Sequence, residues 1–560
     1  MAHRTSSGVN DLEGSDEKKV SHVQEGSSRS DLESGVVLPV YDSDGPVEFA
    51  EKKDLKQGLQ QRHIQMIALA GTIGTGLFLS SGKAIGNGGP LGALLGYTFT
   101  GLLCCGVVMA VSEMSTLIPL SGGVIRHADY FVDPALSFAT GWNQVYADVV
   151  AIPAELCAAA VLFEFWNIDV NVGVWITVLG ICLIVTNIFF VRIYGEVEFT
   201  FAMLKIMLIV AVNIMALVIT CGGGPDHQSI GFRYWRDPGV FVQYLDYPGA
   251  LGQFLGFWTT FENAIYAYSG IQNITLAAAE TQNPRRNIPK AAKRIFARVT
   301  LFYVLTIFMV TLVVPSDDPS LFSLGGSAKS PFVIAARNAG IKVVPSIINA
   351  VILTSAWSSG NSSMLGGSRI LYGLAREGLA PKVFRKTNRF GIPWVAVSLF
   401  AVSICLAYMS LSAGANIAFE WLQDLVAVAA LCDWMVICIV YLRFYYGMKK
   451  QGISRKELPW KSPFQPYMTW TSLILFTIIL FTGGYVTFIN GRWETETFFS
   501  SYFNIPLILA LYFGYKFLKK SKIVALEDIP IRHYIDIAKA NPEPPEPPKS
   551  GLRKLNFLWE

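Results

Sequence analysis

The chain has 560 residues and a net charge of +4, and 52% of its residues are hydrophobic while only 15% are charged. A soluble globular chain carries about 25% charged residues, and at this length it would need several domains, each with a polar surface. The composition excludes a soluble protein, and the long apolar runs predict an integral membrane protein in a lipid bilayer, with no nucleic-acid partner.

Residues 1–62 are polar and rich in Ser, Glu and Lys. This composition predicts a disordered cytoplasmic N-terminal tail and no cleavable signal peptide. The tail lysines could accept ubiquitin through contact with a ubiquitin ligase, although exposed lysines are commonplace; they are Lys18, Lys19, Lys52, Lys53 and Lys56. Residues 63–518 are expected to form a twelve-helix domain, and residues 519–560 a cytoplasmic C-terminal tail.

A helix needs about 20 mostly apolar residues to cross the hydrocarbon core of a bilayer, and twelve segments meet this requirement. We therefore predict an all-α integral membrane fold with twelve transmembrane helices. The segments lie near residues 64–80, 91–117, 136–162, 172–191, 197–220, 251–279, 296–314, 341–371, 395–411, 418–441, 468–489 and 501–517.

Positive charge is sorted between the loops. Six Lys or Arg residues lie in each of the stretches 285–298, 369–389 and 443–461, which connect even-numbered to odd-numbered spans, whereas the loop between spans nine and ten has none. Because cytoplasmic loops carry the excess of Lys and Arg, both termini are predicted to be cytoplasmic.

Two spans contain helix breakers. Span one carries Gly71, Gly74 and Gly76, and span six carries Gly270 between the polar residues Ser269 and Gln272. The two breaks correspond if the first ten helices form two inverted halves of five, and such paired breaks are typical of 5+5 inverted-repeat transporters with broken helices 1 and 6.

The break in span one suits a bound carboxylate. Unwound backbone at membrane depth is tolerated only where protein, water or ligand satisfies its polar groups, and a half-helix that begins at Gly76 would point free N–H groups and a positive dipole end at the break. Thr72 and Thr75 add hydroxyls. The alternative is that these small residues only let helices pack closely.

Several ordered stretches carry a family resemblance that extends from about Leu59 to Leu458. They are Gly71 to Phe78, Glu113 to Gly122, Phe131 to Leu136 with Gly141 to Asn143, Pro153 to Glu155, Gly195 to Phe199 with Lys205, Asn349 to Ala375, and Phe419 to Leu422. In these stretches the chain resembles the fungal amino-acid permease family, within the amino acid–polyamine–organocation superfamily. The resemblance implies proton-coupled amino-acid uptake by a twelve-helix inverted-repeat fold.

The resemblance also implies a substrate site. The backbone of Ile73, Gly74, Thr75 and Gly76 would hold the substrate carboxylate. The span-six break, with Tyr268, Gly270, Ile271 and Gln272, would receive the α-amino group. Many relatives have Glu where this chain has Gln272, and glutamine cannot titrate. Either coupling uses other residues, or the substrate preference differs, or transport is not proton-driven.

Ionisable residues inside spans are functional hypotheses by default. Lys205 in span five is the leading proton-coupling candidate, because desolvation favours the neutral amine and the resemblance places a lysine of this helix beside the span-one break. A snorkelling lysine or a fixed ion pair is the alternative.

Three carboxylates are further coupling candidates: Glu155, Asp148 and Glu113. Asp148 and Glu155 lie seven residues apart and share a helix face; Asp148 could supply negative charge missing at Gln272, or make a polar contact to a neighbouring helix. Glu113 could act as a gate, or form a structural ion pair with a cytoplasmic Arg. Serines of span eight could line the pathway beside Lys205, and Tyr266 and Tyr268 could cap the substrate.

Enzyme signatures are missing from the sequence. It has no phosphate-binding Gly-Lys-Ser/Thr loop, and its eight cysteines and six histidines show no metal-ligand spacing, so we expect no enzyme activity, cofactor or metal. A secondary active amino-acid permease in the plasma membrane is the favoured interpretation. A non-transporting amino-acid sensor or receptor on the same fold is the alternative, and the modest tails favour transport.

Overall fold

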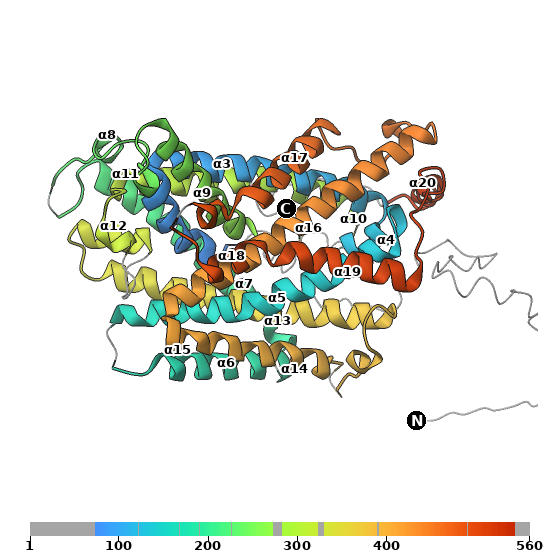
Figure 1. Cartoon of the computed structure of the whole chain (residues 1–560), viewed down its shortest axis with the longest axis horizontal. Coiled ribbons are helices and arrows are strands. Elements are labelled where there is room, and N and C mark those ends of the chain that lie inside the picture. Colours follow the sequence, from blue (N-terminus) through green and yellow to red (C-terminus); the bar gives the residue numbers. More distant parts are fainter. Residues whose placement is uncertain are drawn as a thin grey trace, which may run out of the picture. The chain divides into compact units, whose positions relative to one another are not determined.

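The computed structural model describes residues 73–120, 122–166, 169–189, 191–225, 227–272, 283–322, 330–388, 391–489 and 491–543. This part of the chain consists of helices and their connections, with no strand (Figure 1). It confirms the all-α prediction. The predicted tail of residues 1–62, with its candidate ubiquitin-acceptor lysines, lies outside the described residues.

The first described helices depart from the predicted boundaries. A short helix, α2 (Thr75–Phe78), leads through Leu79 into the 38-residue helix α3 (Ser80–Leu117). α3 contains a kink at Gly89, whose φ of 75° and ψ of 174° favour glycine. A helical stretch of α3 therefore runs on to a kink near residue 89, where the sequence predicted that span one ends at residue 80.

Most of the later spans follow the predicted segments. The later spans are α5 (Pro134–Phe163), α6 (Val172–Phe189), α7 (Val191–Thr220), α9 (Ala250–Tyr268), α10 (Pro284–Arg298) with η5 (Val299–Val304) and α11 (Leu305–Val313), α13 (Val344–Arg376), α14 (Trp394–Ser403) with η8 (Ile404–Met409) and α15 (Ser410–Ala413), α16 (Ala415–Lys450), α17 (Tyr467–Thr482), and α18 (Thr495–Tyr502) with α19 (Asn504–Lys519). However, α9 ends at Tyr268 rather than at residue 279, and α10 begins at Pro284 rather than at residue 296.

Seven described helices are long and apolar enough to cross a membrane, and the pair α18 and α19, bent by 44°, makes an eighth. α17 has only 16 residues. α9 and α13 are not in this set; α9 carries Gln253, Glu262 and Asn263, and α13 carries several Ser and Asn residues. The structure therefore supports a multi-pass membrane protein, and the count of twelve spans stays a prediction.

Spans five positions apart in the sequence lie side by side. α3 packs against α9 and α10, α5 against α13, and α6 against α14. This pairing is expected for two repeats of five helices. α6 also presents apolar side chains outward, since Val174, Val178 and Ile181 are about half exposed, as a lipid-facing helix should.

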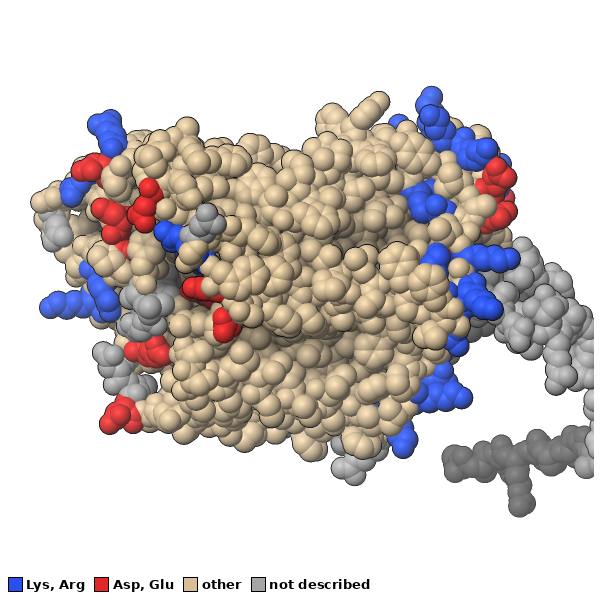
Figure 2. All heavy atoms as spheres, viewed as in Figure 1, with Lys and Arg blue, Asp and Glu red and all other residues tan. Residues whose placement is uncertain are grey.

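Charged side chains gather towards two opposite ends of the view in Figure 2, and a broad band between them is almost free of charge. The end that carries mostly Lys and Arg is where α20 (Ile531–Ala540) lies, next to the short helix α4 (Val124–Phe131) (Figure 1). Such a distribution fits a membrane-embedded band with a cytoplasmic face at the basic end.

Candidate functional site

The site begins with a short stretch of non-helical backbone. Ile73 and Gly74 precede α2, and Gly74 is extended, with φ −139° and ψ −158°. Ser355 of α13 donates a hydrogen bond to the carbonyl oxygen of Ile73 at 3.3 Å, and Tyr97 of α3 donates to that of Gly76 at 3.4 Å. Side chains of two neighbouring helices therefore bind the backbone here, whereas Gly71 and Thr72 of the predicted break lie outside the described residues.

The glycines around the start of α2 meet different surroundings. A Cβ atom at Gly76 would lie 2.6 Å from the Cα atom of Ala267, so this glycine permits close contact between α2 and α9. A Cβ atom at Gly74 would instead lie 3.6 Å from the Glu155 carboxylate and from the Ser359 hydroxyl. The packing interpretation fits Gly76, whereas Gly74 borders polar groups.

A polar ring surrounds this segment, formed by Thr75, Glu155, Tyr266 and Ser359. The Thr75 hydroxyl donates to Glu155 Oε2 at 3.0 Å and lies 3.2 Å from the Tyr266 hydroxyl. Tyr266 in turn donates to Glu155 Oε1 at 3.5 Å, and Ser359 also hydrogen-bonds this carboxyl group. The polar ring thus joins α2, α5, α9 and α13 around one buried carboxyl group.

Lys205 of α7 lies beside the polar ring and is only 1% exposed, so it does not snorkel to the membrane surface. Its ammonium donates to Ser358 at 3.2 Å, and Ser358 donates to Glu198 Oε2 at 2.8 Å. Glu198 and Glu155 are the carboxylates that interact with its charge. The lysine is therefore held between two acids, one of which belongs to the polar ring.

The span-six break lies at the end of α9. α9 ends at Tyr268, and Gly270 has a φ of 79°, a conformation that favours glycine. Ile271 is buried next to it. The side-chain carbonyl oxygen of Gln272 accepts a hydrogen bond from the Trp434 indole of α16 at 3.0 Å. The predicted acceptor for the substrate amine is thus already engaged by Trp434.

The two tyrosines near this break point in different directions, as residues two apart on a helix do. Tyr266 belongs to the polar ring. Tyr268 is fully buried; it donates to the carbonyl oxygen of Tyr97 at 3.1 Å and packs on the ring of Tyr303 at 4.4 Å. Of the two predicted caps, Tyr266 is therefore the one that faces the span-one break.

The other two candidate carboxylates lie elsewhere. Asp148 is placed between α13 and α16, where Ser363 hydrogen-bonds it and Asp433 is a charged neighbour. Glu113, near the end of α3, accepts both a 3.1 Å and a 2.6 Å hydrogen bond from the Arg455 guanidinium, and a 2.7 Å bond from the Ser462 amide. These contacts fit the structural ion pair that the sequence left open for Glu113.

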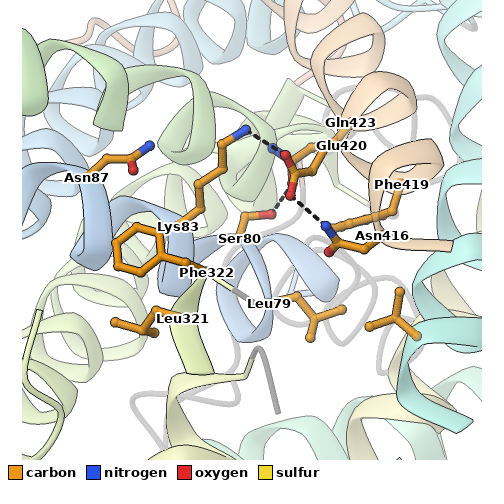
Figure 3. Close-up of a pocket in the computed structure, with 11 residues that line it drawn as sticks. Leu79, Ser80, Lys83, Asn87, Leu321, Phe322, Asn416, Phe419, Glu420 and Gln423 are labelled. Carbon is orange, nitrogen blue, oxygen red and sulfur yellow. Dashed lines mark hydrogen bonds and ion pairs between the residues drawn. The ribbon is translucent and has the colours of Figure 1, made fainter. Parts of the chain in front are cut away.

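A cavity of about 190 Å³ lies at the junction of α2 and α3 and contains an ion pair that the sequence did not predict (Figure 3). The Lys83 ammonium pairs with Glu420 at 3.1 Å, and Asn416 donates to the other oxygen of that carboxylate at 2.9 Å. Ser80 of α3 also donates to Gln423 of α16. Leu79, Leu321, Phe322 and Phe419 supply apolar lining. Only Glu420, an ionisable residue within predicted span ten, gave a signal in the sequence; Lys83 falls between the predicted spans one and two.

The buried polar site inside a bundle of apolar helices defines the class: a multi-pass membrane transporter. A family model described as amino acid permease matches residues 63–527. The chain belongs to the amino acid permease family.

Individual relatives agree with this assignment. A proline-specific permease of Saccharomyces cerevisiae is 38% identical over 512 residues, which is 89% of this chain and 81% of the relative. A proline-specific permease of Emericella nidulans is 40% identical, over 84% of this chain and 86% of the relative. A dicarboxylic amino acid permease of Saccharomyces cerevisiae is 35% identical, over 87% and 81%.

A solved structure, a manganese transporter of Eremococcus coleocola, has a similar fold. Its TM-score is 0.51 at 14% identity, over 84% of this chain and 94% of that chain.

Proposed function

We propose that this protein is a secondary active permease that imports an amino acid together with protons across the plasma membrane by alternating access. Both termini lie in the cytoplasm in this proposal. The observation that carries it is the polar ring of Thr75, Glu155, Tyr266 and Ser359 around the non-helical backbone of Ile73 and Gly74, in a chain that belongs to the amino acid permease family.

The substrate carboxylate binds the backbone from Ile73 to Gly76. Gly74 has no side chain to fill the space beside Glu155 and Ser359, so a ligand can approach the backbone closely there. The span-six break, with Gly270, Ile271 and Gln272, completes the pocket, and Tyr266 rather than Tyr268 is the tyrosine that faces the substrate.

The substrate amine lies nearest to Glu155. Its carboxyl group is the acidic group of the polar ring, whereas the Gln272 carbonyl already accepts from Trp434. Lys205 is paired through Ser358 with Glu198, so its charge is already compensated and does not call for an acidic substrate side chain. The preferred substrate is therefore a neutral amino acid.

Coupling uses Glu155 and Lys205, because Gln272 cannot titrate. A proton on Glu155 would weaken its attraction for the Lys205 ammonium, and loss of a proton from Lys205 would have the same effect, so each step changes the charge balance between α5 and α7. Asp148 and Glu113 remain secondary candidates, and the contacts of Glu113 with Arg455 and Ser462 favour a structural role for it.

The test is uptake of labelled amino acids in cells that lack their own permeases. The panel begins with proline, since two of the relatives are named as proline-specific permeases, and includes acidic and basic amino acids. Saturable uptake of a neutral amino acid that falls when a protonophore is added is the expected result.

Two other outcomes would each remove a part of the proposal. If protein delivered to the cell surface takes up no amino acid, the permease is overturned and a sensor is favoured. If uptake is insensitive to the protonophore, only the proton coupling is overturned.

A further inference from the structure

The chain does not leave the helix bundle after α19. Residues 522–543, here called the strap, fold back over the basic end of the bundle and include α20 (Figure 1). The strap contacts α4, α16 and α10, which are far apart in the sequence.

The first half of the strap is held firmly. The Val524 amide donates to the carbonyl oxygen of Val132, just after α4, at 2.8 Å. The Gln451 amide group, just after α16, donates to the carbonyl oxygens of Leu526 at 2.9 Å and Ile529 at 2.8 Å.

Apolar contacts add to these hydrogen bonds. Ile529, Ile531 and Ile535 are at most 2% exposed, and a Cβ atom at Gly447 of α16 would lie 2.9 Å from the Ile529 side chain. Burial of these apolar side chains stabilises the contact with α16, so this part of the strap stays packed on the bundle.

The far end of the strap is attached differently, at the start of α10. The Glu543 carboxylate accepts hydrogen bonds from the backbone amides of Arg285 at 2.7 Å and Arg286 at 3.1 Å. The Arg285 guanidinium donates back to the carbonyl oxygens of Ala538 at 2.8 Å and Asn541 at 2.5 Å. A carboxylate at a helix N-terminus is stabilised by the free amides and the helix dipole. These polar contacts stand apart from the buried isoleucines, so this end separates more easily than the first half.

The elements that the strap joins are those that must separate if the site opens towards the basic end. α10 continues through η5, where Tyr303 packs on Tyr268 at the end of α9. α16 carries Trp434, which binds Gln272 at the span-six break. A strap fixed to α16 and bonded to the start of α10 therefore restrains both sides of the break together.

We propose that the strap is a built-in clamp that keeps the cytoplasmic side of the site closed, with Glu543 as the latch that releases α10. The proposal rests on the alternating-access function proposed above. Releasing the latch favours opening to the cytoplasm while the first half of the strap stays in place.

The test uses one introduced reporter cysteine in the full-length protein, and the same background without it, which keeps the five buried native cysteines, gives the rate to subtract. Gly366 of α13 lies seven residues after Ser359, so it is on the same helix face, and a Cβ atom there meets nothing within 4 Å. Gly366→Cys is made in a background in which the exposed Cys182, Cys221 and Cys405 are changed to Ser. Its rate of modification by a thiol reagent is measured in inside-out vesicles.

Glu543→Ala is expected to raise this rate about five- to tenfold, the effect of losing charge-assisted hydrogen bonds. Glu543→Gln, which keeps an acceptor, should fall in between. The matched control is Glu527→Ala, which removes a strap carboxylate whose ion pair with Lys450 is largely exposed and should leave the rate unchanged.

An unchanged rate in Glu543→Ala, in protein that reaches the membrane in normal amount, would overturn the clamp. An equal rise in Glu527→Ala would overturn it too, because loss of any negative charge from the strap would then raise the modification rate. The cysteine reporter needs no transported substrate. A failure of the proposed function would therefore appear as absent uptake, and the modification rates would still test the clamp independently.

Discussion

At the scale of single residues, Gly74 and Gly76 illustrate two uses of a missing side chain within three positions. Gly76 lets the backbones of α2 and α9 touch, and Gly74 leaves room beside the Glu155 carboxylate. Small residues in a membrane helix usually serve packing, so only the polar surroundings of Gly74 distinguish a binding segment from a packing seam.

The two glycines should therefore respond differently to alanine. Gly76→Ala places a Cβ atom 2.6 Å from the Ala267 backbone, which cannot move without shifting α9, so we expect loss of folded protein and of uptake. Gly74→Ala meets only atoms at 3.6 Å or more and should fold normally while the KM for substrate rises about tenfold or more. Surface amount and uptake kinetics measure the two effects, and normal uptake kinetics in Gly74→Ala would contradict the carboxylate site.

The carboxyl group of Glu155 is expected to make uptake depend on pH. Glu155→Gln keeps an acceptor for Thr75 but removes the charge and the titration, so uptake should become nearly independent of external pH between about 5 and 7.5 and insensitive to a protonophore. Glu164→Gln, at the end of the same stretch of helix, is the matched control and should keep the wild-type pH profile. A wild-type profile in Glu155→Gln would exclude Glu155 from coupling.

The sequence can indicate a site residue where the residue type affects the backbone, as glycine does, but it cannot indicate the direction in which a side chain points. The glycines mark the span-one break directly. By contrast, the sequence does not show which of Tyr266 and Tyr268 faces the span-one break. The packing of α9 decides that it is Tyr266. The Lys83 and Glu420 pair joins residues 337 positions apart, and no local pattern can place such partners together.

At the scale of elements, the length of an apolar run predicts that a membrane helix exists. Polar residues near its ends make the helix boundaries hard to predict. The sequence predicts that span one ends near residue 80, ahead of a stretch that contains Gly86, Gly88 and Gly89. The structure continues the helix to a kink at Gly89, where a Cβ atom would lie 2.8 Å from the Phe241 backbone. Tertiary contact stabilises a helix here that its own sequence does not favour.

The buried residue His127 of α4 is expected to make the stability of the protein depend on pH. Burial, together with the neighbouring charge of Arg126, lowers the pKa of His127 to about 4 from its ordinary value near 6.5. Between these values the unfolded chain binds a proton that the folded protein does not, so stability falls as pH falls from 6.5 to 4, by about 3 kcal/mol in total. Above pH 6.5 the group has no effect.

Thermal unfolding of the purified protein from pH 4 to 7.5 measures this dependence. His127→Gln can still donate to the Ile118 carbonyl oxygen, which the histidine contacts at 3.0 Å, but it cannot titrate, so its loss of stability at low pH should be shallower. His227→Gln changes an exposed loop histidine and should follow the wild type. Identical slopes for all three proteins would show that His127 is not the group responsible.

At the scale of the whole molecule, one end of the helix bundle is tied together by charged contacts between distant segments. Arg455 binds Glu113 of α3, and Glu457, two residues later, binds Arg532 and Lys539 of α20. The Lys539 hydrogen bond and both cationic neighbours lower the pKa of Glu457. The sequence predicts that Lys and Arg gather at this end of the bundle, but it does not reveal which ion pairs they form.

Removing Arg455 should therefore be costly. Arg455→Ala leaves the fully buried Glu113 carboxylate without its cation, and an uncompensated buried charge costs about 3–5 kcal/mol. The melting temperature should fall clearly, and Glu113→Gln in the same chain should restore part of it. Arg492→Ala removes an ion pair whose Asp246 side chain is 99% exposed, and it should change the melting temperature little. Equal melting temperatures for Arg455→Ala and Arg492→Ala would contradict a structural role for the Glu113 pair.

The π-helical turn η5 (Val299–Val304) sets the rotational phase between the two ends of span seven. A π-helical turn is in effect an α-helix with one residue inserted, and one residue corresponds to about 100° of rotation. Deleting a single residue from η5 would turn α10 by that angle relative to α11 and carry Arg285 and Arg286 away from Glu543. Length variation at this point in evolution would thus have to be matched at the far end of the chain, so η5 and the strap should vary together among homologous permeases.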